Sequence, residues 1–374
     1  MVQEFAEVFY FCRRLMNHRA VNFTPGPSQL YFTVEDHMRQ AFRESIPSIS
    51  HRSKKFEEIF SGCTDGLKTL LGIPSGYHIF FTGSATEIWE RIIQNLVETS
   101  SFHLVNGSFS KRFFEVSKQL NRDALAIEVA AGEGFREGIT IPPNTELIAV
   151  THNETSTGVT TSPNVIYQLR RQHPDALIAV DAVSSLPYPD FDYQQFDTVF
   201  FSVQKAFGLP AGLGVWIVND RCLGKAEALL SKGLSIGSYH TLPSLHTHAV
   251  KNQTPETPNV LGIYLLGCVV QDFLRRGITA LRKETEYKAA ILYQALEQHS
   301  QIRPFVQDKE WQSKTVIVAD CGEHTARIAG ALQGKGLFPG DGYGSSRKSQ
   351  LRFANFPTHS KEQFELLVDS LGTL

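Results

Sequence analysis

The stretch FFSVQKAFGLPAGLGV (residues 200–215) places one lysine, Lys205, between an apolar run and a glycine-rich run. Moving an ammonium group out of water is costly, so charged side chains are usually kept out of such surroundings. A low dielectric favours the neutral amine, which is the form used in Schiff-base chemistry with carbonyl compounds. The alternative is an ordinary lysine at a strand end, with its stem buried and its charge in solvent. The stretch alone leaves both interpretations open.

Several short apolar runs precede or include this stretch, and helix-like segments separate them. Each run is continuous rather than alternating, which is typical of strands that are buried on both faces of a sheet. Strands that alternate with helices predict an α/β domain with a mainly parallel sheet. The predicted strands are 77–83, 101–107, 124–130, 146–154, 176–185 and 197–205, and the predicted helices are 85–99, 110–120 and 162–174.

The length of the chain, 374 residues, favours two domains rather than one core. After a proline-rich loop (251–260), two further strand-like runs (314–322 and 349–357) and a closing helix indicate a second, smaller unit. We therefore expect three parts. They are an N-terminal extension (1–21), a large domain (22–258) and a small C-terminal domain (259–374).

Composition indicates an ordinary globular protein, since 42% of the residues are hydrophobic and 20% are charged. The net charge of −2 gives no global attraction to nucleic acid or to an anionic membrane, so we expect neither as a partner. The five cysteines lie far apart and form no CxxC pair, which indicates free thiols in a reducing cytoplasm and no metal site. The first twenty residues carry their charges in the wrong order for a secretory signal.

Polar residues gather where the predicted strands end, and ligands in open α/β sheets bind at such ends. TGSATE (82–87) leads into a helix whose first N–H groups can hold a phosphate. Asp181 follows an apolar run and can pair with a cationic ring nitrogen. Lys205 can bond to an aldehyde. Separately, each feature is also typical of an ordinary cap, core acid or strand-end lysine. Together, the three describe pyridoxal 5′-phosphate.

The chain resembles the class V branch of the fold-type I enzymes that use this cofactor, from about Asn22 to its carboxyl terminus. The resemblance implies a large domain with a mainly parallel, mixed seven-stranded sheet between helices, and a smaller C-terminal α+β domain. It depends on nine motifs in order: NFTPGPSQL (22–30), SISHRSKKF (48–56), TGSATE (82–87), NGSF (106–109), HNETSTG (152–158), DAVSS (181–185), SVQKAFGLPAGLGV (202–215), QTPETPNV (253–260) and LRFANFPTHS (351–360).

The resemblance also implies which residues contact the cofactor. Lys205 forms the covalent link and acts in catalysis, and Asp181 pairs with the ring nitrogen. Further residues bind the cofactor phosphate, stack on the ring or bond to the ring oxygen. A loop of the partner subunit also reaches the cofactor, so the resemblance implies a homodimer with shared active sites. These residues are Ser84, Ala85 and Gln204 for the phosphate, Phe109 and Val183 for the two ring faces, Thr155 for the ring oxygen, and Gln253 and Thr254 for the partner loop.

Substrate contacts follow from the same resemblance. Arg352 matches the arginine that grips a substrate α-carboxylate, for which its planar fork of donors is suited. Gly26 and Pro27 line the pocket beside the α-carbon. His51 and Arg52 can bind a substrate phosphate, although similar segments occur in relatives whose substrates carry none.

The implied activity is that of an aminotransferase acting on small amino acids and 2-oxo acids, and the chain looks most similar to phosphoserine:2-oxoglutarate transaminases of serine biosynthesis. The His–Arg pair that many of those enzymes carry in the carboxyl-terminal loop is not evident. DGYGSSRKSQ (341–350) stands there, with Arg347 and Lys348. Alternatives that stay open are a serine–pyruvate or alanine–glyoxylate transaminase, a lyase using Cys321, and a non-catalytic protein that binds the cofactor.

Overall fold

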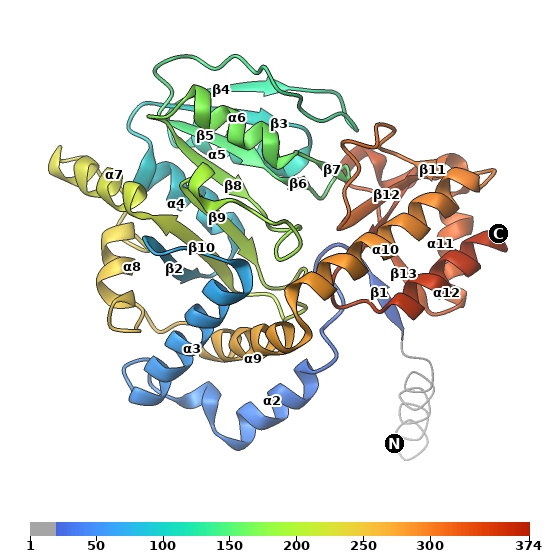
Figure 1. Cartoon of the computed structure of the whole chain (residues 1–374), viewed down its shortest axis with the longest axis horizontal. Coiled ribbons are helices and arrows are strands. Elements are labelled where there is room, and N and C mark those ends of the chain that lie inside the picture. Colours follow the sequence, from blue (N-terminus) through green and yellow to red (C-terminus); the bar gives the residue numbers. More distant parts are fainter. Residues whose placement is uncertain (1–19) are drawn as a thin grey trace, which may run out of the picture.

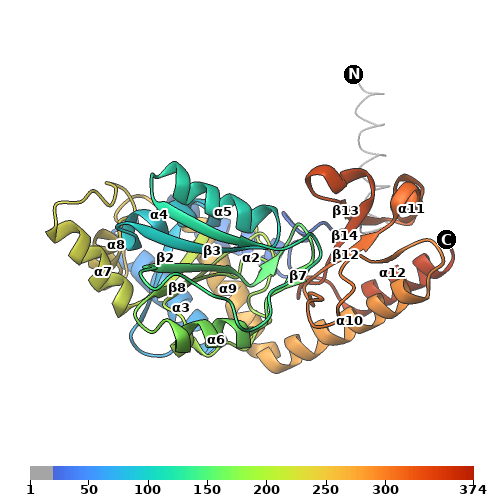
Figure 2. The same ribbon diagram turned by 90° about the horizontal axis from the view of Figure 1, so that it is seen from above.

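The computed structural model describes residues 20–374, which form a large and a small sheet with helices packed around them. Figure 1 shows the two sheets side by side, with the long helix α10 (Ile278–Gln298) running from their junction along the smaller unit. Seen from above, helices lie on both faces of the larger sheet (Figure 2). This arrangement confirms the α/β class and the seven-stranded sheet inferred from the sequence.

The larger sheet is parallel except at one strand. β10 runs antiparallel to both of its neighbours, β2 and β9, and all other neighbouring pairs are parallel. Across the sheet the strands are β2 (Tyr77–Thr82), β10 (Gly214–Asn219), β9 (Thr198–Ser202), β8 (Leu177–Asp181), β5 (Leu147–Thr151), β3 (Ser100–Val105) and β4 (Asp123–Glu128). Every residue of β5, β8 and β9 is buried, as their continuous apolar sequences predict.

Two features of this sheet differ from the sequence-based expectation. The run 124–130 was expected to be buried on both faces, but β4 is one of the two edge strands and Leu125 is 54% exposed. An edge strand lacks a neighbouring strand on one side, and the residues of β4 alone do not reveal that it lies at the edge. β10 was not predicted as a strand, because the glycines that precede it indicate a loop.

The helices seal the two faces of the sheet with their apolar sides. On α6, Ser162 is the N-cap and Pro163 the first residue, as predicted. Serine N-caps also begin α4, at Ser84, and α3, at Ser53. The bounds are α2 (Val34–Arg43), α3 (Lys54–Leu71), α4 (Ala85–Leu96), α5 (Ser108–Gln119), α6 (Pro163–Gln172), α7 (Asp220–Ser231), α8 (Leu242–Ala249), α9 (Val260–Arg276), α11 (Thr325–Gly334) and α12 (Lys361–Gly372).

The smaller sheet contains the predicted strands at 314–322 and 349–357, and α12 is the predicted closing helix. Its strands, in order, are β1 (Val21–Phe23), β13 (Leu337–Asp341), β14 (Gln350–Ala354), β12 (Val316–Asp320) and β11 (Arg303–Pro304). β1 pairs with β13, so the described chain starts in the smaller unit, while α9 packs on α3 of the larger one. The domain boundaries stay a prediction, and these contacts tie the two units together.

No helix within residues 20–374 is long and apolar enough to span a membrane.

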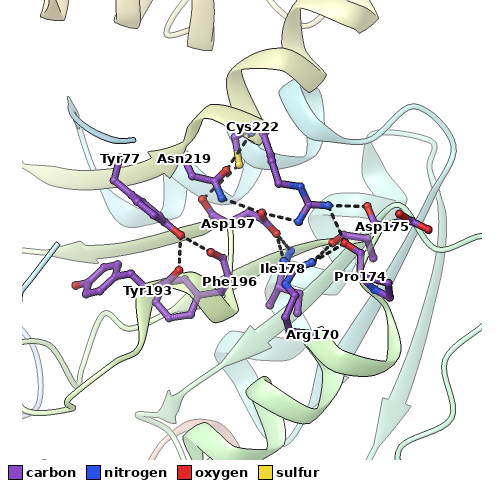
Figure 3. A network of polar contacts seen from close by, with 12 residues as sticks. Tyr77, Arg170, Pro174, Asp175, Ile178, Tyr193, Phe196, Asp197, Asn219 and Cys222 are labelled. Atoms are coloured by element: carbon purple, nitrogen blue, oxygen red, sulfur yellow. Dashed lines mark hydrogen bonds and ion pairs between the residues drawn. The ribbon is translucent and has the colours of Figure 1, made fainter. Parts of the chain in front are cut away.

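Asp197 connects several elements through a network of polar contacts (Figure 3). It directly precedes β9 and so lies at the end of that strand opposite to Lys205. The side chain is 1% exposed. Its carboxylate accepts hydrogen bonds from the Ile178 backbone N–H at 2.8 Å, from Asn219 at 2.9 Å and from Arg221 at 3.0 Å. It also forms an ion pair with Arg170. One buried acid thereby joins α6, β8, β10 and α7.

We expect Asp197→Ala to lower the free energy of unfolding by about 3–5 kcal/mol, because removing one partner of a buried ion pair leaves the other charge uncompensated. Urea denaturation followed by tryptophan fluorescence measures this change. Asp175→Asn is the control, because the Asp175 side chain is exposed beside the same network, and it should change stability by less than about 0.5 kcal/mol. Equal losses in the two variants would contradict the role assigned to Asp197.

Candidate active site

Lys205 lies just beyond the carboxyl end of β9 and is buried, with 8% of its surface exposed. Its Nζ donates a hydrogen bond to the Pro25 carbonyl at 2.6 Å. A Cβ added at Gly26 would come within 2.0 Å of the same Nζ, so only glycine permits the chain to cross the amine this closely. The interpretation of Lys205 as a strand-end lysine with its charge in solvent is therefore wrong.

The electrostatic surroundings of Lys205 favour its neutral form. Burial, and after it the Arg352 guanidinium, lower the pKa of the amine from an ordinary value of 10.5 to about 8. Asp181 and Glu154 act in the opposite direction. A substantial fraction of the amine is therefore neutral near physiological pH, which is the state that nucleophilic and general-base chemistry require.

Asp181 ends β8, the strand beside β9, and is 3% exposed. Its Oδ1 accepts from the Val183 backbone N–H at 3.0 Å, and its Oδ2 accepts from the Trp89 indole Nε1 at 2.9 Å. Burial raises the pKa of Asp181 to about 6, while these two hydrogen bonds and the charge of Lys205 lower it. Neighbouring strand ends thus present a buried acid and a buried amine to the same region, as predicted.

The predicted phosphate site lies at the start of α4. Ser84 is the N-cap and accepts from the Glu87 N–H, and the Ala85 N–H donates to Ser202 Oγ at 3.0 Å. Gln204, next to Lys205, has a buried Oε1 without a hydrogen-bond partner among residues 20–374. An amide oxygen cannot bond to a phosphate oxygen because both are acceptors, but the Nε2 group of the same side chain is a donor, and it is through Nε2 that Gln204 fits a phosphate site.

Phe109 and Tyr343 form an aromatic wall beside Lys205. The Phe109 ring centroid lies 5.9 Å from Lys205 Nζ and 5.1 Å from the Tyr343 ring. A flat aromatic surface at this place suits stacking on a heterocycle. Val183 is half-buried in the segment that follows Asp181 and packs against the apolar cluster between α4, α5 and the sheet, so its place under the ring stays a prediction.

Glu154 is a residue of the candidate site for which the sequence predicted no role. It is fully buried, and its carboxylate accepts from the backbone N–H groups of Phe109 and Ser110, at 3.3 and 2.9 Å, and from Ser156 Oγ at 2.6 Å. It therefore fixes the first turn of α5, which carries Phe109, against the hairpin of β6 (Asn153–Glu154) and β7 (Val159–Thr160). Thr155 lies buried in the turn of that hairpin. The available signal was a carboxylate within the otherwise uncharged ETSTG segment.

Arg352, on β14 of the smaller unit, reaches the same region. Its Nε donates to the Asp341 carbonyl at 2.6 Å and its Nη1 to the Thr155 carbonyl at 3.2 Å. The guanidinium carbon lies 5.4 Å from the Tyr343 ring centroid. Burial and, to a smaller extent, the charge of this guanidinium lower the pKa of Lys205. Arg352 is therefore placed to attract an anionic substrate group to the Lys205 amine.

Four predicted site residues form a second cluster: His51, Arg52, Gln253 and Thr254. Arg52 Nη1 donates to Gln253 Oε1 and to the Thr254 carbonyl, both at 2.8 Å. Gln253 Nε2 in turn donates to Glu57 at 2.8 Å. Burial and the charge of Arg52 lower the pKa of His51. None of these contacts includes Lys205 or Asp181, so the role of this cluster across a dimer stays a prediction.

The remaining candidates have unremarkable surroundings. Arg347 is exposed and pairs with Asp341 at 3.2 Å, and Lys348 is exposed beside it. Cys321 is 1% exposed, and burial raises the pKa of its thiol to about 12, which disfavours the nucleophilic thiolate that a lyase needs. Residues 20–374 contain no group of three or more His, Cys, Asp or Glu side chains that could hold a metal ion.

This geometry agrees with comparisons to known proteins. The model of the class V aminotransferase family matches residues 126–340, which is more than half of the chain, so the protein belongs to this family. The resemblance inferred from the nine motifs is thereby confirmed.

Individual relatives within the family differ in how similar they are to this chain. The chain is 53% identical to the solved structure of a phosphoserine aminotransferase from Cytophaga hutchinsonii, with a TM-score of 0.93, covering 95% of this chain and 98% of that one. It is 28% identical to a phosphoserine aminotransferase of Rhodococcus opacus, over 92% of this chain and 91% of the relative. An alanine–glyoxylate aminotransferase from Nostoc, at 20% identity and a TM-score of 0.75, shares the fold.

The protein is therefore a transaminase that depends on pyridoxal 5′-phosphate, and its residues fit that cofactor. Gln204, next to Lys205, offers a side-chain amide whose Nε2 can donate to a phosphate oxygen. Asp181 is a buried acid that can pair with a cationic ring nitrogen, and Lys205 is a buried amine in reach of an aldehyde.

We expect Lys205 to titrate near pH 8 in full-length protein from which the cofactor has been removed. Acetic anhydride acetylates only neutral amines, so the labelling of the Lys205 peptide, followed by mass spectrometry, should rise as the pH increases through 8. Arg352→Gln should move the midpoint to higher pH, because the arginine lowers the pKa of Lys205. A labelling midpoint near pH 10 that stays the same in the Arg352→Gln variant would contradict the electrostatic description.

Proposed function

We propose that this protein transfers the amino group of phosphoserine to 2-oxoglutarate. The observation that carries the proposal is the 53% identity to the Cytophaga hutchinsonii phosphoserine aminotransferase over almost the full length of both chains. The Rhodococcus opacus relative supports the same substrate class.

The reducing cytoplasm is the proposed compartment, since Cys63, Cys222, Cys268 and Cys321 are free thiols.

The bound cofactor supplies an electron sink for the bond that breaks at the substrate α-carbon. Lys205 is the proposed covalent anchor and the group that takes and returns the α-proton, and its pKa of about 8 suits a general acid and base near neutral pH. Asp181 would pair with the protonated ring nitrogen of the bound cofactor. Its two hydrogen bonds, from Val183 and Trp89, favour the ionised carboxylate that this pairing needs.

Arg352 is the proposed partner of the substrate α-carboxylate. Its Nε and Nη1 donate to backbone carbonyls, which fix the plane of the guanidinium, and it has further N–H groups to offer. Gly26 follows the Pro25 carbonyl that holds Lys205 and passes directly against the amine, and Pro27 comes next along the chain, so both are proposed to line the substrate pocket there.

A homodimer with shared sites is part of the proposal. Gln253 and Thr254 of one subunit would contact the cofactor phosphate of the other, and His51 and Arg52 would face the substrate phosphate there. Arg52 binds the loop that carries Gln253 and Thr254 through three hydrogen bonds, to Gln253, Thr254 and Pro255, which supports a role in presenting this loop.

A serine–pyruvate or alanine–glyoxylate transaminase is the second candidate, and one observation favours it. The loop in which a His–Arg pair would bind the substrate phosphate offers Arg347, which is already paired with Asp341. Such an enzyme would share every proposed cofactor contact.

The amino donor can be identified by adding phosphoserine, serine, alanine, glutamate and cysteine separately to the holoenzyme and following the absorbance of the pyridoxamine form. We expect conversion by phosphoserine and glutamate, with phosphoserine preferred over serine on the order of 100-fold, because hydrogen bonds to charged groups each contribute about 1.5–3 kcal/mol. If serine or alanine reacts and phosphoserine does not, the second candidate is correct.

The covalent anchor can be tested against the other buried lysine of the described chain that has a lowered pKa, Lys288. Borohydride reduction of the holoenzyme should add the mass of the reduced cofactor to the Lys205 peptide and leave the Lys288 peptide unchanged. Lys205→Ala should abolish the absorbance of the bound cofactor's covalent form and transamination, whereas Lys288→Met should keep that absorbance. Cofactor mass on another lysine would contradict the assignment.

A further inference from the structure

Trp89 is a buried residue of α4 that the motifs of the family did not single out. It lies in the second turn of the helix that begins at Ser84 and Ala85, and it is 4% exposed. Its indole Nε1 donates to Asp181 Oδ2 at 2.9 Å, across 92 positions of sequence. The indole therefore touches the acid that is proposed to face the cofactor ring.

The two hydrogen bonds of Asp181 fix the plane of its carboxylate. Val183 N–H holds Oδ1 and Trp89 Nε1–H holds Oδ2, so rotation about the bond to the carboxylate would break both. Each carboxylate oxygen has two acceptor sites, so these bonds leave room for a third donor such as a protonated ring nitrogen. The backbone donor follows from the turn after β8, whereas the indole donor depends on a side chain from another element.

Trp89 also connects Asp181 with the other proposed cofactor contacts. The phosphate turn and the indole lie on one helix, which keeps a fixed spacing between the two ends of the ligand. The indole ring stacks on Phe113, with centroids 5.9 Å apart and planes inclined by 17°. Phe113 lies one turn after Phe109 on α5, the helix whose first turn provides the proposed stacking ring.

We propose that Trp89 is a positioning residue for the cofactor, whose indole N–H holds the Asp181 carboxylate in the orientation that pairs with the ring nitrogen. The inference rests on the proposed role of Asp181 and is independent of which amino acid is the substrate. Without the N–H, Oδ2 loses its buried donor, and the carboxylate is free to rotate and to become protonated.

The competing explanation is that Trp89 only fills space in the apolar cluster between α4, α5 and the sheet. Trp216 on β10 is a matched control for that explanation. It is fully buried in the same cluster, and its Nε1 also donates a hydrogen bond, to Thr198 Oγ1 at 2.8 Å, but not to Asp181. Replacement of either tryptophan by phenylalanine removes one ring and one buried hydrogen bond.

The test is the dissociation constant for pyridoxal 5′-phosphate of the full-length protein, with the pH titration of the bound cofactor's absorbance as a second readout. Trp89→Phe should weaken binding about tenfold and shift the titration, because a hydrogen bond to a charged acceptor is lost. Trp216→Phe should change binding less than about threefold. Equal effects of the two substitutions on binding and titration would overturn the proposal.

A double-mutant cycle with Asp181→Asn tests whether the indole acts through the acid. In the Asp181→Asn background, Trp89→Phe should weaken binding less than about threefold further, and an undiminished tenfold effect would overturn the proposal. If Asp181→Asn alone binds the cofactor and transaminates like the unaltered protein, the proposed role of Asp181 is wrong. If Asp181→Asn is defective and Trp89→Phe is not, only the inference about Trp89 is wrong.

A variant that keeps the shape of the indole separates its N–H from its packing. Site-specific incorporation of 3-benzothienylalanine at position 89 replaces the N–H by sulfur and keeps the ring, so this variant should fold even if Trp89→Phe does not. It should reproduce the weaker binding and the shifted titration. Unaltered binding and titration in this variant would overturn the proposal.

Discussion

The burial of the large sheet on both faces is the constraint on which the site depends. Strands β8 and β9 are parallel neighbours, and all of their residues are buried. Such strands can present polar side chains to a ligand only where they end, and parallel strands end on the same edge. Asp181 ends β8 and Lys205 follows β9, so one edge of the sheet receives both groups. The chemistry of the site is thus positioned by the apolar packing that surrounds it.

The same burial sets the protonation of both groups. Desolvation raises the pKa of Asp181 to about 6 and lowers that of Lys205 to about 8, so each is moved towards its neutral form. Their mutual attraction opposes this movement without cancelling it. Arg352 lowers the pKa of the Lys205 amine and Glu154 raises it, so the final pKa also depends on the balance between these two charges. Lys205 can therefore change protonation near neutral pH, which proton transfer at a substrate carbon requires, whereas the hydrogen bonds from Val183 and Trp89 favour the ionised form of Asp181.

The sequence predicted the parts of the site that depend on a residue's own strand. Asp181 and Lys205 could be found because a charged residue at the end of an apolar run is visible in the local sequence. Trp89 could not, because its partner lies 92 positions away and an aromatic residue on an amphipathic helix is typical of ordinary core. Glu154 was missed for a related reason, since its donors come from α5. The edge position of β4 and the strand β10 are likewise properties of the assembled sheet.

Burial of a lysine is not enough to make it reactive, and the chain contains its own comparison. Lys288 is fully buried and its pKa is lowered to about 7, yet its Nζ donates to the carbonyls of Phe356 and His359, at 3.0 and 2.7 Å. Those bonds join α10 to the segment before α12 and occupy the amine. Among residues 20–374, Lys205 Nζ has one hydrogen-bond partner, the Pro25 carbonyl, and it lies beside an aromatic wall and an arginine. A low pKa therefore reports burial in both lysines, while the unused bonding capacity of Lys205 is what distinguishes a reactive amine from a structural one.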